Sequence, residues 1–598
     1  MKKWSTVLLI TLLFVWGSSR AGASDEIQQD LTITYELGQD SVTSAKYEVK
    51  LTNLTTEKYA NGFVLKLQRI NPENIRAYEG DKELKYFAHK SEDTTEIEVL
   101  LSDKVVGKGN AREIVIFFQD RNLVKRTGEV REIFMPKLEG ADEFDGLKLE
   151  LIVPKSYGEA AYMTPKPEIE TENENTVNYY FGRKQIKSSG ITAAFGSFQI
   201  FGMRLVYHLN NPANEKVNFD IAIPPDTAYQ RIIYEKIEPK PESVRKDGDG
   251  NWLASYEIEA RSRLDVTVEG GAQIFSGPIM PYIAEDDKTK YIKESHYWQK
   301  NNESISAIAQ ELGSAERIYE FVVRTLSYDY DRVKPNTERM GAYGALASPE
   351  NAICTEFTDL FIALARAAGI PAREVNGYAY TDNSVLKPLS LVADILHAWP
   401  EYWDEGRKEW IQIDPTWGKT TGGVDYFNKF DLRHITFVKH GENVDKPIPP
   451  GSYKLGENPQ KDVFINVGKM PEVKEENLKI TIKKADKYVL GKTRFVIGVR
   501  NEGQRAVYEK RLEVFADELK IKEFEIAEVL PYSEVEESIE IESGLIGSRL
   551  PKKISAVIGE EKGEIVTSKG IVTMAGLIVI LGLITIATAY IYIRTKRR

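Results

Sequence analysis

The sequence contains a single cysteine, Cys354, in a chain of 598 residues. One cysteine forms no disulfide within the chain, so each domain must be held together by its own hydrophobic core. Basic residues are not in excess either: the formal net charge is −11, and no basic surface with interleaved aromatic residues is evident. Both observations argue against a nucleic-acid partner. Histidine is also scarce, at six residues, which leaves few candidates for acid–base chemistry.

The composition is that of a folded protein, with 42% apolar and 28% charged residues. A chain of this length implies about three or four domains.

Both ends of the chain carry segments typical of membrane targeting. Residues 1–23 have a basic start, an apolar stretch and a small-residue cleavage pattern, and they predict a secretory signal peptide. Residues 571–593 are free of charge and predict a transmembrane helix, followed by a basic cytoplasmic tail at 594–598. We therefore expect a single-pass type I protein of the cell membrane whose bulk is extracytoplasmic.

Most of the remaining chain has the period-two alternation of β-strands. The stretches "SAKYEVKLTN" (44–53) and "KVNFDIAIPP" (216–225) are examples, and they predict β-rich domains at 24–155 and 156–285. A linker at 446–470 leads to a further β domain at 471–565, which resembles the Ig-like sandwiches that often precede a membrane anchor.

Residues 296–445 have a different character and are expected to form an α+β domain. Apolar residues at helical spacing predict helical structure within 304–328. A second helix follows Cys354, because Phe357, Phe361 and Leu364 recur at intervals of three to four, and Gly369 is placed to end it. A thiol at a helix N-terminus is favoured as a thiolate, the reactive form. Taken alone, Cys354 is better explained as a buried structural cysteine, one of the commonest fates of a free thiol.

Two further residues complete a pattern suited to thiol chemistry. A thiol nucleophile needs an imidazole that takes its proton and a carboxylate that orients the imidazole. His397 begins "HAWPEYW" (397–403), and Asp414 lies in "WIQIDPTW" (410–417). The alternation on both sides of "EGRK" (405–408) predicts a β-hairpin that brings His397 and Asp414 together on one sheet.

These motifs, in this order, resemble the transglutaminase-like superfamily. The resemblance covers residues 305–440 and rests on the helix motif around Cys354, "HAWPEYW" and "WIQIDPTW". It implies a papain-like core with Cys354 as the nucleophile, His397 as the base and later the acid, and Asp414 as the orienting carboxylate. It also implies an oxyanion hole built from the cysteine N–H and an upstream side chain, for which Tyr343 is the candidate. The family usually carries glycine just before the cysteine, where this chain has Ala352-Ile353.

The predicted fold is thus multidomain and mostly β, with an α+β papain-like core, β-sandwich domains on both sides and one C-terminal transmembrane helix. The predicted function is hydrolysis of amide or peptide bonds through a cysteine thioester, with a protein or peptide as substrate. Protein cross-linking by acyl transfer to amines is one alternative, and a non-catalytic surface protein with a vestigial core is another. No cofactor or metal is predicted, and the oligomeric state is left open.

Other residues near the motifs have two interpretations. Trp399, Trp410 and Trp417 either line a substrate cleft or pack in the core. His434 is either a group that supports the catalytic residues or a core histidine with its hydrogen bonds satisfied.

Overall fold

The structure is a computed structural model, in which the chain divides into two compact units, Met1–Gly196 and Ser197–Arg598. The predicted signal peptide lies outside the described residues, and export stays a prediction. The structure describes residues 26–91, 94–188, 190–279, 288–334, 337–381, 390–391, 394–421, 424–428, 430–454, 460–469, 471–472, 476–485, 492–543, 550–567 and 571–596.

The first unit is built almost entirely of strands. One sheet runs in the order β13 (Ile169–Glu172), β14 (Thr176–Gly182), β11 (Gly146–Pro154), β1 (Ile27–Leu37), β2 (Thr43–Asn53), β8 (Ala111–Asp120), β4 (Glu73–Glu79) and β5 (Lys82–Glu83). A smaller sheet runs in the order β3 (Tyr59–Gln68), β7 (Thr94–Val106), β6 (Tyr86–Lys90). Another runs in the order β12 (Ala160–Thr164), β15 (Ile191–Phe195), β10 (Val130–Met135), β9 (Val124–Thr127). A short helix, α1 (Arg183–Ser188), follows β14. Strands within 160–195 therefore pair with strands before residue 155, and the break between the units falls at 196–197.

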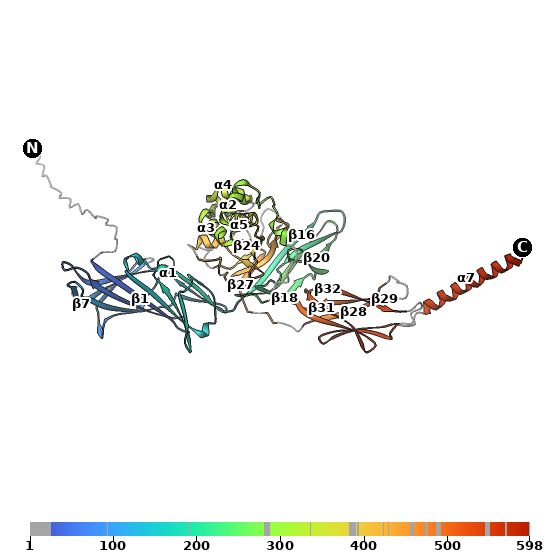
Figure 1. The fold of residues 1–598 in the computed structure, drawn as a ribbon, viewed down its shortest axis with the longest axis horizontal. Helices are drawn as coiled ribbons and strands as arrows, with labels where there is room; N and C mark the ends of the chain where they lie inside the picture. Colours follow the sequence, from blue (N-terminus) through green and yellow to red (C-terminus); the bar gives the residue numbers. More distant parts are fainter. Residues whose placement is uncertain are drawn as a thin grey trace, which may run out of the picture. The chain divides into compact units, whose positions relative to one another are not determined.

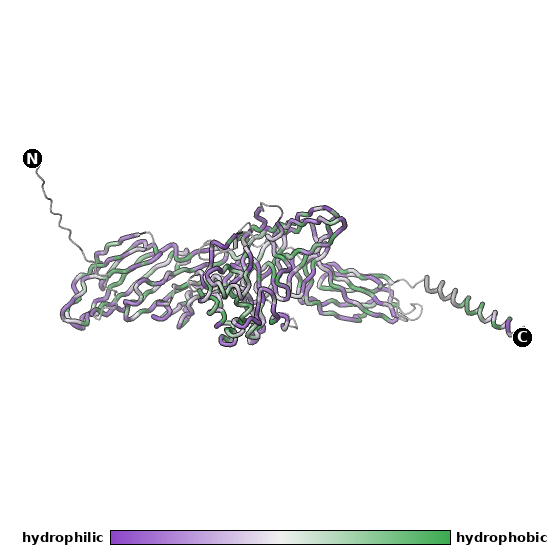
Figure 2. The backbone as a smooth tube through the Cα atoms, turned by 90° about the horizontal axis from the view of Figure 1, so that it is seen from above, coloured by the Kyte–Doolittle hydropathy of each residue, from purple (hydrophilic) through white to green (hydrophobic). Residues whose placement is uncertain are grey.

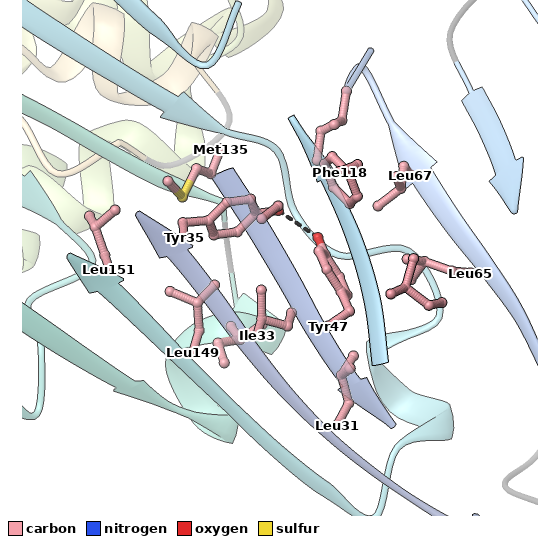
Figure 3. Packing of buried hydrophobic residues seen from close by; sticks show 14 of the residues in the cluster. Leu31, Ile33, Tyr35, Tyr47, Leu65, Leu67, Phe118, Met135, Leu149 and Leu151 are labelled. Atoms are coloured by element: carbon pink, nitrogen blue, oxygen red, sulfur yellow. Dashed lines mark hydrogen bonds between the residues drawn. The ribbon is translucent and has the colours of Figure 1, made fainter. Parts of the chain in front are cut away.

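Alternating residues of these strands form the core of the first unit. Leu31, Ile33 and Tyr35 of β1 and Tyr47 of β2 are each at most 3% exposed, and their side chains meet across the strands (Figure 3). The hydroxyls of Tyr35 and Tyr47 hydrogen-bond to each other at 2.5 Å, which satisfies both polar ends within an apolar core. The alternation is visible along the strands in Figure 2.

The second unit begins with two β layers. The first runs β18 (Gln230–Glu238), β21 (Ser262–Phe275), β16 (Phe198–Asn211), β27 (Val463–Val467), and the second runs β17 (Val217–Ile223), β20 (Trp252–Ile258), β19 (Ser243–Lys246). Strand β27 comes from the segment expected to be a linker, and it pairs antiparallel with β16 over Phe201–Leu205.

The helical part of the second unit forms around one central helix. The central helix is α5 (Cys354–Ala367). It is contacted by α2 (Glu303–Leu312), α3 (Ala315–Thr325), α4 (Gly341–Ala347) and α6 (Pro415–Thr420). Figure 1 shows α2 to α5 together. The helical segment predicted within 304–328 is two helices, because Gly313 ends α2 in a left-handed conformation (φ +66°) and Ser314 caps α3.

A five-stranded sheet packs against α5. Its order is β23 (Ser390–Leu391), β24 (Ile395–Asp404), β22 (Ala372–Ala379), β26 (His434–His440), with β25 (Glu409–Gln412) also paired to β24. The β24–β25 pair, with Asp404 opposite Glu409, is the hairpin predicted from the sequence. Its presence is confirmed.

The outer edge of this sheet is held by amide side chains from the preceding β layers. Gln230 donates to the Thr436 carbonyl at 2.9 Å and accepts from the Thr436 N–H at 2.8 Å. Asn251 makes the same pair of bonds with Lys439, at 2.9 and 2.7 Å. The backbone groups of Thr436 and Lys439 on the edge strand β26 are thus satisfied by side chains from another layer of the same unit.

The C-terminal β region forms two further sheets. They run β28 (Leu478–Lys484), β29 (Lys492–Asn501), β32 (Glu534–Glu542), and β31 (Leu519–Val529), β30 (Val507–Ala516), β33 (Lys553–Ile558), β34 (Glu561–Val566). The apolar residues of both enclose one core that includes Phe495, Ile497 and Leu512. Of the residues that the structure describes, 51% lie in strands, so the prediction of a mostly β, multidomain protein is confirmed.

The predicted transmembrane helix at 571–593 is wrong. A helix forms there, α7 (Ile571–Lys596), but no helix within the described residues is long and apolar enough to cross a membrane.

Candidate active site

Cys354 is the first residue of α5, and Ile353 is its N-cap residue. The helix forms here because its inward residues, such as Phe357 and Phe361, are fully buried. The Glu356 carboxylate accepts hydrogen bonds from the N–H of Ile353 and the N–H of Met340, both at 3.0 Å, and so fixes the chain that leads into the helix. Ile353 has extended dihedrals (φ −116°, ψ −175°), so this entry does not require the glycine usual in the superfamily that the motif resembles.

His397 lies on β24, where it is opposite Gly377 of β22. A side chain at Gly377 has no room: an added Cβ would lie 2.0 Å from the Ile435 carbonyl oxygen and 2.7 Å from the Trp399 ring. The glycine therefore allows the strands around His397 to approach closely. The imidazole itself is 1% exposed.

Asp414 follows the hairpin and caps the next helix. Its Oδ1 accepts from the Trp417 N–H at 3.0 Å, which makes it the N-cap of α6, and Pro415 occupies the first helical position. Its Oδ2 is 2.9 Å from Nε2 of His397, and both side chains are fully buried. An ionised carboxylate only accepts hydrogen bonds, so Nε2 of His397 carries the proton in this bond.

The charges of this pair stabilise each other. Burial lowers the pKa of His397, but the charge and hydrogen bond of Asp414, together with the nearby Cys354, outweigh burial and raise the pKa to about 9. Burial raises the pKa of Asp414, but His397 and His434 more than offset this and hold it below its ordinary value. Asp414 is therefore ionised throughout the physiological range.

The geometry leaves Nδ1 of His397 for the thiol. Nδ1 has no hydrogen-bond partner among the described residues, whereas Nε2 is bound to Asp414. Cys354 lies close enough to His397 to contribute to the raised pKa of that imidazole. The structure thus brings Cys354, His397 and Asp414 together in that order, with Cys354 itself 2% exposed.

Aromatic rings enclose the imidazole. The Trp417 ring stacks on His397 with centroids 5.4 Å apart, and the Trp399 ring stacks at 5.9 Å. Both indoles are fully buried, and Trp399 donates to the side chain of Gln412 at 3.2 Å. They pack around the base and keep water from it, which strengthens the interaction between His397 and Asp414.

A second histidine reaches the same carboxylate. Nε2 of His434 is 3.2 Å from Oδ2 of Asp414, and Nδ1 of His434 is 2.6 Å from Oδ1 of Asp431. All three side chains are at least 98% buried. His434 is a core histidine with both nitrogens bonded, and it also contacts a predicted catalytic residue.

The same side chains have the composition of a metal site. One ligand atom from each of His397, Asp414 and His434 lies within 4.8 Å of the others. However, Nε2 of each imidazole already hydrogen-bonds to Asp414. A metal ion would have to replace the proton in both bonds, so the geometry as it stands is suited to holding protons.

A tyrosine that the sequence did not single out lies beside the thiol. The backbone of Tyr328 bridges to Ala352, and the Asp329 N–H donates to the Ala352 carbonyl at 2.8 Å. The Tyr328 hydroxyl is shielded from solvent and has no hydrogen-bond partner among the described residues. Burial raises the pKa of Tyr328 and the nearby Cys354 raises it further, so the hydroxyl remains a neutral O–H donor.

Tyr343, the side chain predicted to complete the oxyanion hole, has a different environment. It lies on α4 with 51% of its surface exposed. Its backbone N–H donates to the side chain of Gln299 at 3.1 Å, and the described residues show no bond between Tyr343 and Cys354. Sequence spacing gave no reason to prefer Tyr328, because only the fold reveals a hydroxyl left without a partner.

Comparison with known protein families agrees with this geometry. Residues 299–415 match the family model of the transglutaminase-like superfamily. The chain carries a transglutaminase-like domain. The match includes Cys354, His397 and Asp414, so the resemblance to this superfamily expected from the sequence is confirmed.

The relatives of the transglutaminase-like domain align over a limited region. Over 119 residues the chain is 33% identical to an uncharacterized protein of Mycobacterium tuberculosis (strain ATCC 25618 / H37Rv), covering 19% of this chain and 35% of that protein. Over 124 residues it is 30% identical to a protein-glutamine gamma-glutamyltransferase of Pseudomonas aeruginosa, covering 19% of this chain and 18% of that enzyme. The chain thus spans about a third or less of the length of these relatives.

One solved structure covers more of the chain with less similarity. It is a cysteine protease-like protein from Cytophaga hutchinsonii, 14% identical, which covers 46% of this chain and 87% of its own, with a TM-score of 0.30. A likeness of that size carries no conclusion about activity.

Proposed function

We propose that the transglutaminase-like domain breaks amide bonds by transferring the acyl group to Cys354. The observation that carries this proposal is the buried arrangement in which Asp414 binds Nε2 of His397 and leaves Nδ1 for a thiol at a helix N-terminus. Each of the three residues has the chemical type and the partner that its role needs.

The first step forms a thioester. The proton of the Cys354 thiol lies on Nδ1 of His397, as an imidazolium beside a thiolate, and the sulfur attacks the carbonyl carbon of the amide. The resulting oxyanion lies near the N–H of Cys354, which has no acceptor within the helix because it belongs to the first turn. His397 then gives the proton to the leaving nitrogen, the C–N bond breaks, and an amine departs.

The second step releases the acyl group. His397 takes a proton from an incoming nucleophile, which attacks the thioester carbon, and the thiol leaves with that proton. With water as the nucleophile the enzyme is a cysteine protease or amidase, and this is the function we propose. With a lysine amine it is a cross-linking enzyme. This second candidate is favoured by the 30% identity to a protein-glutamine gamma-glutamyltransferase.

A single experiment separates the two reactions. The full chain is incubated with a mixture of proteins and peptides, with and without a fluorescent primary amine, and the products are followed by mass spectrometry. Hydrolysis predicts cleaved or deamidated products whose yield does not depend on the amine. Cross-linking predicts incorporation of the amine at glutamine. A folded protein that does neither over a broad set of substrates contradicts the proposal.

Tyr328 is expected to assist the first step as a second oxyanion donor. Replacement of Tyr328 by Phe removes one buried O–H and leaves the ring in place. We expect kcat to fall about 10²-fold with little change in KM, because an oxyanion bond is made mainly in the transition state. The melting temperature should hold or rise slightly, since the hydroxyl has no partner to lose.

Tyr343→Phe is the matched control, since it removes a phenolic hydroxyl from the exposed residue on α4. It should leave kcat unchanged. If Tyr343→Phe lowers kcat and Tyr328→Phe does not, the assignment of the donor is reversed.

A further inference from the structure

The bonds of His434 require a positive charge on its ring. Nδ1 lies 2.6 Å from a carboxylate oxygen of Asp431, and Nε2 lies 3.2 Å from a carboxylate oxygen of Asp414. Ionised carboxylates have no proton to donate, and a neutral imidazole has only one N–H. Both bonds are therefore made only when both nitrogens of His434 are protonated.

The surroundings favour that charged form. Within the part of the chain that the structure describes, the charged groups that face His434 are Asp414, Asp431 and, with ring centroids 5.7 Å apart, His397. Burial lowers the pKa of His434, but the charge of Asp431 and the bonds to both carboxylates outweigh it and raise the pKa above its ordinary value. The backbone N–H of Arg433 also donates to Asp431, at 2.9 Å, and so fixes that carboxylate in place.

Aromatic rings make the cluster water-poor. Phe430, Trp417 and Trp399 lie 4.3, 4.6 and 4.9 Å from the His434 ring, measured between centroids. Coulomb interactions in such a setting are much stronger than in water, so each charge in the cluster strongly affects its neighbours.

We infer that His434 is a positioning residue of the proposed acyl transfer: held as an imidazolium between Asp431 and Asp414, it limits how tightly Asp414 holds the proton of His397. This inference rests on the proposed function, in which Asp414 orients His397. Oδ2 of Asp414 is shared between two cationic rings, at 2.9 and 3.2 Å. A carboxylate that also accepts a hydrogen bond from His434 attracts the His397 proton less than one that accepts a hydrogen bond from His397 alone.

The inference predicts that the pKa of His397 rises when the charge of His434 is lost, a shift that a purely structural role of His434 does not produce. Loss of the His434 charge removes a repulsive cation 5.7 Å from His397. His397 should then keep its proton to higher pH, by about one to two pH units for charges at that separation in a partly buried site. A more tightly held proton is passed less readily to the leaving amine, so turnover should slow about tenfold or more.

The test follows the charge of His397 rather than turnover. Alkylation of Cys354 by iodoacetate, an anionic reagent, should slow as His397 loses its positive charge, and the midpoint of that decline reports the pKa of His397. We expect the midpoint near pH 9 in the wild type and one to two units higher in His434→Gln. His440→Gln is the matched control, because His440 is buried on the same strand but bonds to the Pro447 carbonyl and Glu374. It should leave the midpoint unchanged.

A second variant keeps the ring of His434 in place. Asp431→Asn removes the carboxylate that requires a proton on Nδ1, and it should move the midpoint upward by a smaller amount. Imidazole NMR of isotope-labelled histidine follows the same charges directly, and only six histidines contribute. In the wild type His434 should show no deprotonation through neutral pH.

The outcomes separate the two proposals. If Cys354 shows no pH-dependent reactivity at all, the proposed function fails, whereas the NMR titration still reports on His434. If the wild type reacts as expected but His434→Gln moves the midpoint downward, not at all, or only as much as His440→Gln, the role of His434 is refuted. An NMR titration of His434 near pH 6.5 also refutes it.

Discussion

Cys354→Ala is expected to abolish turnover, with a loss on the order of 10⁶-fold, because no other thiol exists in the chain to replace the nucleophile. Both proposed outcomes, hydrolysis and amine transfer, pass through a thioester on this sulfur, so both should disappear together. The measurement is product formation by mass spectrometry under the conditions that give wild-type activity.

Cys354→Ser serves as the control for shape. The hydroxyl has nearly the volume of the thiol, so the N-terminus of α5 should be undisturbed, but an alcohol beside this imidazole is a far weaker nucleophile than a thiol. Circular dichroism and the melting temperature should match the wild type in both variants. Activity that survives in a folded Cys354→Ala protein would place the reaction elsewhere in the molecule.

Asp414→Asn is expected to lower kcat by about 10⁴-fold while leaving the fold nearly intact. Asparagine is as good an N-cap residue as aspartate, so its Oδ1 can keep the bond to the Trp417 N–H that starts α6. Its NH₂ group then takes the place of the oxygen that faces Nε2 of His397. An amide donor there forces the proton onto Nδ1, and His397 can no longer accept the proton of the thiol.

The pH dependence of this variant has a definite sign. The pKa of His397 is raised from 6.5 to about 9, chiefly by Asp414, so the imidazolium persists to about pH 9 in the wild type. Without the carboxylate charge the pKa should fall, and the alkaline decline of iodoacetate alkylation should move to lower pH. This shift is opposite to the one expected for His434→Gln. The two variants therefore test the same electrostatic account of the His397 pKa with shifts in opposite directions.

The same pair contributes to stability over a defined pH range. Because the folded-state pKa of His397 lies above its unfolded value, the contribution is fully present below pH 6.5 and is lost as the pH rises through 9. A raised pKa of this size corresponds to about 3 kcal/mol of unfolding free energy. Asp414→Asn should flatten this dependence between pH 6.5 and 9, as measured by urea unfolding.

The sequence predicted the parts of the site that depend on local pattern. The hairpin between His397 and Asp414 follows from period-two alternation on both sides of a turn, and it is present. Gly369 ends α5 in a left-handed conformation (φ +79°), as its place after the last apolar residue predicted. The types and order of Cys354, His397 and Asp414 were also evident, although their catalytic roles stay a prediction.

Features that depend on long-range contact were not predictable in this way. Strands on both sides of residue 155 have the same alternation, so the pattern carried no sign that 160–195 pair with the first unit. Strand β27 is short and lies where proline and glycine suggested a linker, and only its pairing with β16 identifies it. Asp431 precedes His434 by three residues, but its bond to the ring exists only because the loop folds back.

The measurement that tests the central claim most directly is the alkylation of Cys354 at pH 6 in the folded full chain, compared between the wild type and His397→Ala. A thiol paired with the raised-pKa His397 is predicted to react much faster than free cysteine at this pH, and His397→Ala is predicted to lose that advantage. The same two proteins in denaturant should react equally, which controls for reagent and concentration. If wild type and variant alkylate at the same rate when folded, or only after unfolding, Cys354 is a structural cysteine and the proposed chemistry is contradicted.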